Sequence, residues 1–309
     1  NFQKTNDNDN NNNKKNYDVR TVQGEIQVVL SQRFQRNVVV VGAGRTDTGV
    51  HARGQALHFD LYPHEIDIMD STPNDNHFCE SLQKSLNSML RRDVRIWNLG
   101  PAPTFPNLPR YYYWHVINDA KSKIYTYRFC TGRAINPNHR HLRVHFHDLT
   151  NDDHHPPVDS KANTANYGQT PLQYERMQQI FSTFVGTHEF LAFAGKVESN
   201  ERKSGKKRTT IRTIHDIRLI DEGNSNYRVD IHLKGALYKM VRNIVGTAFD
   251  VYRGNLSLQN LQEMLQIQEL DENKDNTNIK ITRRNNKSKP VPPEGLTLEK
   301  VFFDDDTDF

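Results

Sequence analysis

A run of four valines that leads into a glycine-rich turn is the feature that most limits how this chain folds. The run covers Val38–Val41, and consecutive β-branched residues are typical of a buried strand. Gly42, Gly44 and Gly49 then let the backbone bend sharply and approach a ligand closely. A second apolar stretch lies within residues 55–59. The segment therefore predicts a strand, a tight turn and a returning strand.

The turn carries one carboxylate and one guanidinium, Asp47 and Arg45. A carboxylate on a glycine-flanked turn at the end of a strand, with a cation two residues away, suits a nucleophile or a base. An exposed ion pair on an ordinary hairpin turn has the same residues. The chemistry of the turn leaves both interpretations open.

The bulk properties are those of a folded protein with long polar segments. The chain has 309 residues, of which 35% are hydrophobic, and this length suffices for one large domain or two small ones. A net charge of +4 is compatible with a polyanionic partner. Its two cysteines, Cys79 and Cys130, lie far apart, which argues against a disulfide framework and against a cysteine-rich zinc site. No apolar run reaches membrane-spanning length, so no membrane association is expected.

Polar stretches interrupt the chain. Residues 6–16 are almost all Asn, Asp and Lys, and residues 61–78, 134–171 and 268–290 are predicted to be inserted loops. These asparagine-rich stretches suggest a eukaryotic source. Because the sequence begins abruptly at Asn1, we expect an upstream segment to be missing. Cytoplasm, nucleus and organelle all stay open as compartments.

Periodicity predicts an α+β protein. Its elements alternate as helix, strand pair, helix and strand, and the order repeats loosely, which indicates two related halves that meet near residues 100–118. We therefore expect an N-terminal half over 1–117 and a C-terminal half over 118–309. Helices are predicted at 21–30, 81–90, 174–185 and 240–249, and further strands at 94–97, 123–129, 211–220 and 226–233.

Two further constellations bear on chemistry. Tyr125 and Tyr127 share one face of a predicted strand, where an aromatic ring suits either stacking on a flipped nucleobase or ordinary sheet packing; the spacing alone favours packing. Arg242 lies inside an otherwise apolar helix start, Met240–Gly246. An arginine there is costly to bury unless it is paired, and Asp47 is a natural partner. A snorkelling surface arginine is the alternative.

Two polar clusters have simpler explanations. His145 and His147 would share a strand face and could bind a metal ion, but a solvated loop is the favoured interpretation because the segment is low in complexity. The basic run Arg202–Arg208 suits phosphate contact, a nuclear address or a flexible loop. The histidine group also contains His139, His141, His154 and His155.

Together these motifs resemble those of the tRNA pseudouridine synthase A (TruA-type) family. Gly44–His51 matches the family sequence Gly-Arg-Thr-Asp-Ala-Gly-Val-His with Thr48 in place of Ala, Tyr125–Tyr127 matches its Tyr-x-Tyr strand, and Met240–Gly246 matches its helix without change. Weaker matches follow in family order along nearly the whole chain, at Arg20–Glu25, Leu86–Asn87, Gly186–Phe190, Arg212–Ile214 and Pro293–Leu296.

The resemblance implies an isomerase that converts uridine in tRNA to pseudouridine, with the anticodon stem-loop as the expected location. It implies two pseudo-related halves that share a mainly antiparallel sheet flanked by helices, with the active-site cleft between them. Asp47 would attack the uridine covalently, at the ribose or at the base. Tyr125 would stack on the base and help to move a proton, and Arg242 would hold Asp47 ionised.

The same resemblance assigns RNA contacts to Arg45, Thr46, His51 and Lys239, with Arg45 keeping the target nucleotide out of its stack. It implies no organic cofactor and no catalytic metal, because no redox step or external nucleophile is involved. Members of the family are often homodimers, so a second copy is an expected partner.

The sequence also departs from the family pattern at three places. The family's early strand with Tyr-Asp-Gly is absent, Trp114–Ile117 replaces Phe-His-Ala-Arg, and Arg91 replaces a common Pro. Against the isomerase stand a non-catalytic RNA-binding protein on the same scaffold, a synthase that acts on other RNAs, and a metal-binding protein that uses the histidine group.

Overall fold

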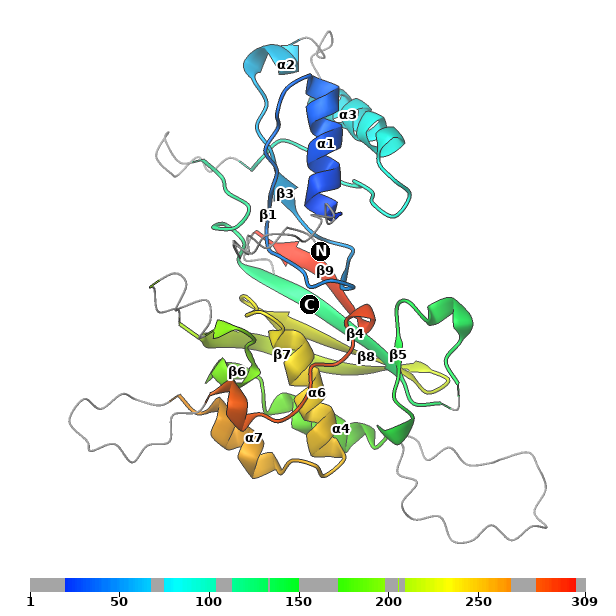
Figure 1. Cartoon of the computed structure of the whole chain (residues 1–309), viewed down its shortest axis with the longest axis vertical. Helices are drawn as coiled ribbons and strands as arrows, with labels where there is room; N and C mark the ends of the chain where they lie inside the picture. The colour runs from blue at the N-terminus through cyan, green and yellow to red at the C-terminus, as the bar shows by residue number, and fades with distance from the viewer. Residues whose placement is uncertain are drawn as a thin grey trace, which may run out of the picture. The chain divides into compact units, whose positions relative to one another are not determined.

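The chain folds into two compact units. The first, unit 1, contains the chain up to Thr48 together with Gln55–Ala120, and the second, unit 2, contains Gly49–Gly54 together with Lys121–Phe309. The polypeptide therefore enters unit 2 briefly before it completes unit 1 (Figure 1). The computed structural model describes residues 20–67, 75–103, 113–132, 134–149, 172–197, 205, 209–267 and 282–303.

Two helices and the valine run build the core of unit 1. Helix α1 (Val22–Phe34) begins at the predicted cap, where the Thr21 hydroxyl accepts a hydrogen bond from the Gly24 amide at 3.1 Å. Helix α3 (Asp75–Met89) turns one apolar face inward because its large side chains recur every four residues. The buried residues are Ile26, Val29, Leu30, Val38, Val40, Phe78, Leu82, Leu86, Leu90 and Val94.

The valine run forms the predicted strand pair in shortened form. Strands β1 (Val41–Gly42) and β3 (Leu57–His58) pair antiparallel in a two-stranded sheet. The prediction of a wholly buried strand is wrong for Val39, whose side chain is 62% exposed, while its neighbours on either side are buried. Alternation along an extended chain turns every second side chain to the other face.

Two predictions for unit 1 need correction. The segment 61–78 is not one loop, because helix α2 (Pro63–Asp67) and the start of α3 lie within it. Residues 94–97 form no strand in the described structure. The Asn87 side chain instead donates to the Ile96 carbonyl at 2.6 Å and accepts from the Ile96 amide at 2.8 Å. A side-chain amide thus supplies both hydrogen bonds that a neighbouring strand would give.

Unit 2 is built on a seven-stranded sheet with the order β2-β9-β4-β8-β7-β6, with β5 attached to the end of β4. Most pairings are antiparallel, and β2–β9 and β4–β5 are parallel. The predicted α+β class with a mainly antiparallel sheet is confirmed. The strands are β2 (His51–Ala52), β4 (Ser122–Cys130), β5 (Val144–His145), β6 (Gly186–Glu189), β7 (Ile211–Gly223), β8 (Asn226–Leu233) and β9 (Leu296–Phe302).

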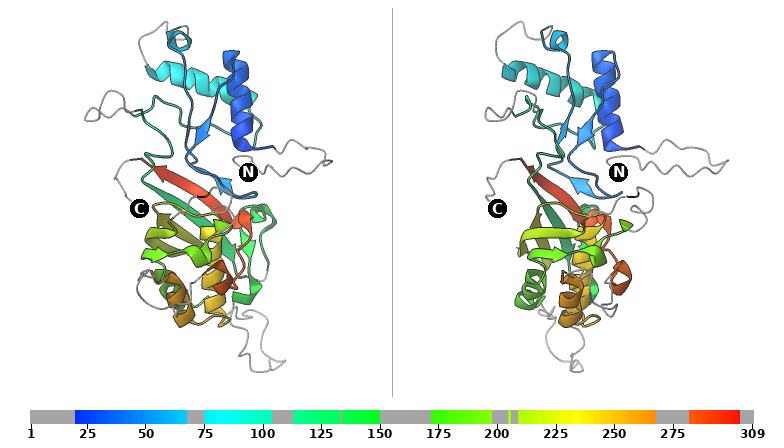
Figure 2. Two further views of the ribbon diagram at one scale, coloured as in Figure 1. Left: turned by 60° about the vertical axis from the view of Figure 1, so that its left-hand side comes forward. Right: turned by 90° about the vertical axis from the view of Figure 1, so that its left-hand side faces the viewer.

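Helices α4, α6 and α7 lie on one side of this sheet (Figure 1, Figure 2). Helix α6 is buried over nearly its whole length, and Phe249 packs edge-on against Phe129 of β4 with ring centroids 5.0 Å apart. Hydrophobic burial of this helix therefore holds its first turn in place against the sheet. The helices of unit 2 are α4 (Tyr174–Ser182), α6 (Met240–Tyr252) and α7 (Leu258–Leu265), with short 3-10 turns η1 (Pro137–His139), η2 (His147–Leu149), η3 (Leu191–Phe193), η4 (Arg283–Asn285) and η5 (Pro293–Gly295).

Parts of two predicted insertions belong to the folded core. Residues 282–291 run along α6, where the Asn286 amide donates to the Thr247 hydroxyl at 2.9 Å and both side chains are buried. Residues 134–149 include strand β5, and Arg143 there is buried and donates to the Phe129 carbonyl at 2.8 Å. Polar sequence misleads here because Asn286 and both Nη atoms of Arg143 form hydrogen bonds with other side chains or with the backbone.

Several predictions fall outside the described residues. They are the asparagine-rich segment 6–16, the missing first strand, His154 and His155, and the basic run except Gly205. Among the described helices, none is both long enough and apolar enough to span a bilayer.

Candidate active site

Asp47 lies on the segment that leaves β1. Backbone and side-chain hydrogen bonds close the base of this segment: the Ala43 amide donates to the Ala56 carbonyl at 2.9 Å, and the Gln55 amide donates to the Gly44 carbonyl at 2.8 Å. Asp47 is half-buried and Arg45 is exposed. The turn thus has a fixed base and presents its charged side chains near its tip.

Directly after Asp47 the chain joins the large sheet. Gly49 has a φ of 83°, and a Cβ atom there would lie 2.9 Å from Cγ of Pro293, so only glycine fits this position without strain. The amides of Arg53 and Gly54 both donate to the Leu298 carbonyl, at 2.8 and 3.2 Å. The residues that follow Asp47 are therefore held to β9 as an edge strand.

Tyr125 lies on β4 between two neighbouring strands, opposite Ile231 of β8 and Leu298 of β9. The register with β9 shifts between Ile124 and Tyr125, which leaves Glu299 as the extra residue of a bulge. Tyr125 is 8% exposed. Bulges are common beside active sites because they redirect side chains.

Tyr127 occupies the same strand face but has a structural environment. It is fully buried, and its hydroxyl donates to the Pro292 carbonyl at 3.2 Å. Burial, with a smaller effect from Glu294, raises the pKa of Tyr127 well above its usual value, and Arg242 acts in the opposite direction. Of the two interpretations of the tyrosine pair, ordinary packing within the sheet therefore applies to Tyr127.

Arg242 lies in the first turn of α6 and is buried, with 9% of its surface exposed. Its Nε donates to the Val291 carbonyl at 2.7 Å, and its own carbonyl accepts from the Val291 amide at 3.2 Å. The alternative of a snorkelling surface arginine is therefore wrong. A guanidinium held in this way near the face of β4 that carries Tyr125 and Tyr127 is preorganised to meet an anion.

The predicted RNA contacts have different environments. Lys239 is the N-terminal cap of α6, with a left-handed backbone at φ 60°. His51, on β2, is half-buried, and its Nε2 is 2.6 Å from the His141 carbonyl, so its ring is engaged in holding β2. Arg45 and Thr46 belong to the Asp47 turn.

Unit 2 contains Tyr125, Arg242, His51 and Lys239, whereas Asp47, Arg45 and Thr46 belong to unit 1.

Lys123 is a residue that sequence reasoning missed. It lies two positions before Tyr125 on β4, and burial lowers its pKa. The alternation of β4 could have indicated it, because positions 123 and 125 share a strand face.

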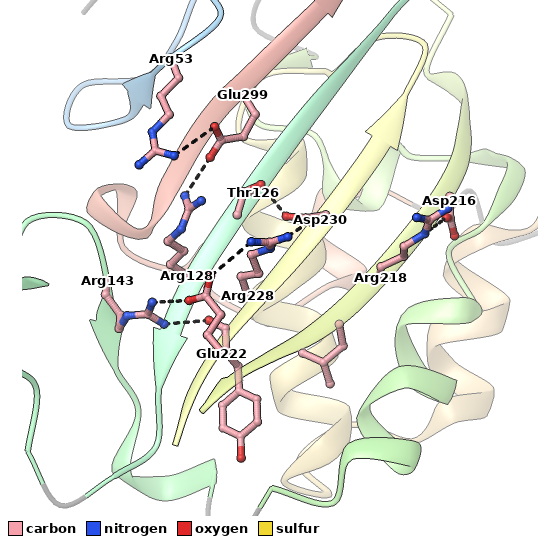
Figure 3. Close-up of polar contacts among 12 residues, drawn as sticks. Arg53, Thr126, Arg128, Arg143, Asp216, Arg218, Glu222, Arg228, Asp230 and Glu299 are labelled. Carbon is pink, nitrogen blue, oxygen red and sulfur yellow. Dashed lines mark hydrogen bonds and ion pairs between the residues drawn. The ribbon is translucent and has the colours of Figure 1, made fainter. Parts of the chain in front are cut away.

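The opposite face of the sheet carries a network of ion pairs (Figure 3). Arg128 donates to the bulge residue Glu299 at 2.9 Å, and Arg53 lies 3.8 Å from the same carboxylate. Burial opposes ionisation of Glu222, but the hydrogen bond from Arg143 and nearby arginines keep its pKa below the usual value. These pairs hold the strand register behind the tyrosines.

The histidine group shows no metal centre among the residues that the structure describes. The rings of His145 and His147 are 6.1 Å apart, and Nε2 of His145 hydrogen-bonds to the Gly132 carbonyl. No cluster of three or more metal-binding side chains occurs within the described ranges.

Comparison with known proteins identifies the family. The family model described as tRNA pseudouridine synthase matches residues 180–304. A tRNA pseudouridine synthase A from Fervidobacterium nodosum is 30% identical over 92% of this chain and 91% of its own length, and one from Streptococcus agalactiae is 30% identical over 82% and 80%. The chain belongs to the tRNA pseudouridine synthase A family.

A relative in Lactococcus lactis is 28% identical over 92% of this chain and 88% of its own length. These three alignments cover most of both chains, so the family relationship includes both units. The α+β fold with its mainly antiparallel sheet is consistent with the pseudouridine synthase fold.

Proposed function

We propose that this protein isomerises uridine to pseudouridine in tRNA. The observation that carries the proposal is the buried, backbone-anchored guanidinium of Arg242 on α6 of a tRNA pseudouridine synthase A family member. A buried cation is costly unless an anion offsets it. In this proposal the anion is the carboxylate of Asp47, which is the nucleophile.

The reaction needs no second substrate. The Asp47 carboxylate forms a bond to the uridine, at the ribose or at the base, and the N1–C1′ glycosidic bond breaks. The uracil rotates, a C5–C1′ bond forms, the proton leaves C5, N1 gains a proton and the bond to Asp47 breaks. Product and substrate are isomers, so atoms and electrons balance within one nucleotide.

Tyr125 is proposed to stack on the rotating base and to move the proton. Its 8% exposure leaves only a small part of its surface open, which suits contact with one face of a base rather than free rotation in water. The neighbouring Tyr127 is fully buried, and β4 pairs with β8 on one side and β9 on the other, which supports the strand around Tyr125. Support of this kind lets a catalytic group act without reorganisation.

The RNA contacts follow from charge and exposure. Arg45 is proposed to hold the target nucleotide out of its stack, with Thr46 beside it on the same turn and Lys239 bound to a phosphate. His51 takes part by holding β2 through the His141 carbonyl at 2.6 Å. A net charge of +4 favours a polyanionic substrate.

The anticodon stem-loop is the proposed location of the target uridine. Loop nucleotides are unpaired, so flipping one of them costs less than flipping a base out of a duplex. A homodimer is also proposed, as the family resemblance implies. Sedimentation velocity measures this directly: a species of one chain's mass at micromolar concentration would contradict it.

The test of the function is turnover. Wild-type protein and Asp47→Asn are incubated with tRNA transcripts, and pseudouridine is mapped by chemical modification and primer extension. Asparagine keeps the shape of the side chain but removes the nucleophile, so we expect product from wild type and a loss of at least about 10⁴-fold in the variant. Pseudouridine in a stem-loop other than the anticodon arm would contradict the proposed location but not the proposed activity.

Two outcomes would replace the proposal. Tight tRNA binding without product would favour a non-catalytic RNA-binding protein. Product in other RNAs but not in tRNA would favour a synthase with another substrate. Equal product from wild type and Asp47→Asn would show that Asp47 is not the nucleophile.

A further inference from the structure

Tyr238 is an exposed aromatic residue between two lysines. Its side chain is 42% exposed, and the ammonium groups of Lys239 and Lys196 lie 5.4 and 5.8 Å from the centre of its ring. Lys239 is adjacent in sequence, whereas Lys196 follows η3 and reaches the ring through the fold. We name these three residues the tyrosine platform.

The backbone of both lysines is strained. Five non-glycine residues of the described chain have positive φ, and three of them lie where such a conformation is expected: Gln35 ends α1, and Asn224 and Ser225 form the hairpin turn between β7 and β8. The other two are Lys196 and Lys239, with φ of 58° and 60°. Strained backbone persists where the surrounding structure enforces it, and it gathers at functional sites.

The ring of Tyr238 is held from the side of Gly195. The Gly195 amide donates to the Tyr238 carbonyl at 2.8 Å, and a Cβ atom at position 195 would lie only 2.8 Å from Cδ1 of the ring. The glycine thus lets the backbone pack against the ring. Tyr238 is thus held on the side of Gly195, while 42% of the residue's surface stays exposed.

The platform lies next to the proposed catalytic arginine. Lys239 caps α6, and Arg242 follows three residues later, which is about 4.5 Å along the helix axis. Arg242 is buried whereas Tyr238 is exposed. A strand of RNA whose target uridine reaches Arg242 would therefore place an adjoining nucleotide near the platform.

We propose that the tyrosine platform binds a nucleotide that flanks the target uridine. Its base stacks on the ring of Tyr238, and Lys196 and Lys239 contact the phosphates on either side. The inference rests on the proposed function, since it assumes an RNA substrate at Arg242. An aromatic ring accepts any base because every base has a π-face, and lysines bind phosphates as point charges. The ligand class is an unstacked nucleotide of single-stranded RNA.

Substitution of the ring tests the stacking. Tyr238→Ala should weaken tRNA binding by about 5- to 150-fold, which is the range for loss of one stacked base, whereas Tyr238→Phe keeps the ring and should stay within about twofold of wild type. Fluorescence anisotropy with labelled tRNA gives the Kd. Tyr62→Ala is the matched control, because Tyr62 is 53% exposed and has Arg36 4.3 Å above its ring but lies in unit 1. Equal weakening by Tyr62→Ala, or none by Tyr238→Ala, would overturn the proposal.

Substitution of the lysines tests the phosphate contacts. Lys196→Gly and Lys239→Gly remove the charge but keep a residue that adopts positive φ without strain. In the double variant the slope of log binding constant against log salt should fall in magnitude by about 1.4, since each single-strand phosphate contact contributes about 0.7. An unchanged slope would show that the lysines serve only as surface neighbours of the ring.

Cross-linking of the wild-type protein avoids any question of folding. Irradiation of the complex with tRNA that carries 5-bromouridine beside the modified position, followed by mass spectrometry, should place the cross-link on the peptide that contains Tyr238. A cross-link confined to other peptides would contradict the inference. Because binding and cross-linking are measured without turnover, a protein that binds in this way yet forms no pseudouridine would refute the proposed function and leave the platform standing.

Discussion

Arg242 illustrates how one residue can be predicted in type but not in environment. An arginine inside an apolar helix start already indicates a partner, but the bond from its Nε to the Val291 carbonyl depends on a segment 49 positions away. Tyr238 is harder still, because Lys196 reaches it only through the fold. Sequence therefore identifies the residues that lie within motifs and misses those that distant segments bring together.

Gly295 is a second position where a single atom matters. A Cβ atom there would lie 2.8 Å from Cζ of Tyr127 and 2.9 Å from the Arg128 carbonyl oxygen. Gly295→Ala should therefore lower the free energy of unfolding by about 1–3 kcal/mol, as overpacking does in well-packed cores. Urea unfolding followed by far-UV circular dichroism measures this.

The matched control for that substitution is Gly235→Ala. A Cβ atom at Gly235 meets no atom within 4 Å, so its effect should stay within about 0.5 kcal/mol. If the two variants unfold at the same urea concentration, then close packing of η5 over Tyr127 is not what position 295 requires.

At the scale of elements, the predicted strands and helices with long, regular patterns are confirmed. Strand β4 and the β7–β8 hairpin have clean alternation, and α6 has a continuous apolar sequence. Residues 94–97 have the pattern of a strand but form none in the described structure, because the Asn87 side chain takes the place of the neighbour. Residues 282–290 have the composition of a loop but pack along α6, because their polar groups find buried partners. The sequence pattern thus predicts most helices and strands well, but it predicts poorly which other segments they pair with or pack against.

Helix α2 and the loop after α3 are held by ion pairs, and we expect these pairs to make the stability of unit 1 depend on pH in the acid range. The hydrogen bond from Arg36, 2.6 Å from the carboxylate, lowers the pKa of Glu65 from 4.5 to about 2. The hydrogen bond from Arg20, 2.7 Å away, lowers the pKa of Asp93 from 3.8 to about 2. As pH falls, Glu65 and Asp93 are protonated in the unfolded chain before they are protonated in the folded chain. The stability that their ion pairs contribute is therefore fully present above about pH 4.5 and is lost as pH falls towards about 2.

The prediction can be measured in unit 1 alone, because both tryptophans of the chain, Trp97 and Trp114, lie there. Urea unfolding followed by tryptophan fluorescence should show a midpoint that falls between pH 4.5 and pH 2. The double variant with Glu65→Gln and Asp93→Asn should begin with a lower midpoint and lose less of it over the same interval. An identical pH dependence in wild type and double variant would show that other carboxyl groups control acid unfolding.

At the scale of the whole molecule, the sequence predicts two halves, 1–117 and 118–309, but not the excursion of the chain between them. The compact units differ from this simple division because Gly49–Gly54 belongs to unit 2. A strand of two residues has too little pattern to be predicted by alternation, and a parallel edge partner leaves no local signal. We propose that this excursion has a catalytic purpose, since it begins two residues after Asp47.

The excursion predicts that the backbone of Arg53 matters more than its side chain. The Arg53 amide donates to the Leu298 carbonyl at 2.8 Å, whereas its guanidinium is 64% exposed and lies 3.8 Å from Glu299. Arg53→Pro removes the amide hydrogen and should reduce kcat for pseudouridine formation by at least about tenfold, because misplacement of a catalytic group by about 1 Å has effects of that order or larger. Arg53→Ala keeps the amide and loses only an exposed ion pair, so its kcat should stay within about threefold of wild type. Urea unfolding followed by far-UV circular dichroism, which reports on both units, should show the same midpoint in both variants, which separates a displaced Asp47 segment from general instability. Equal losses of kcat in the two variants would instead assign the effect to the guanidinium of Arg53.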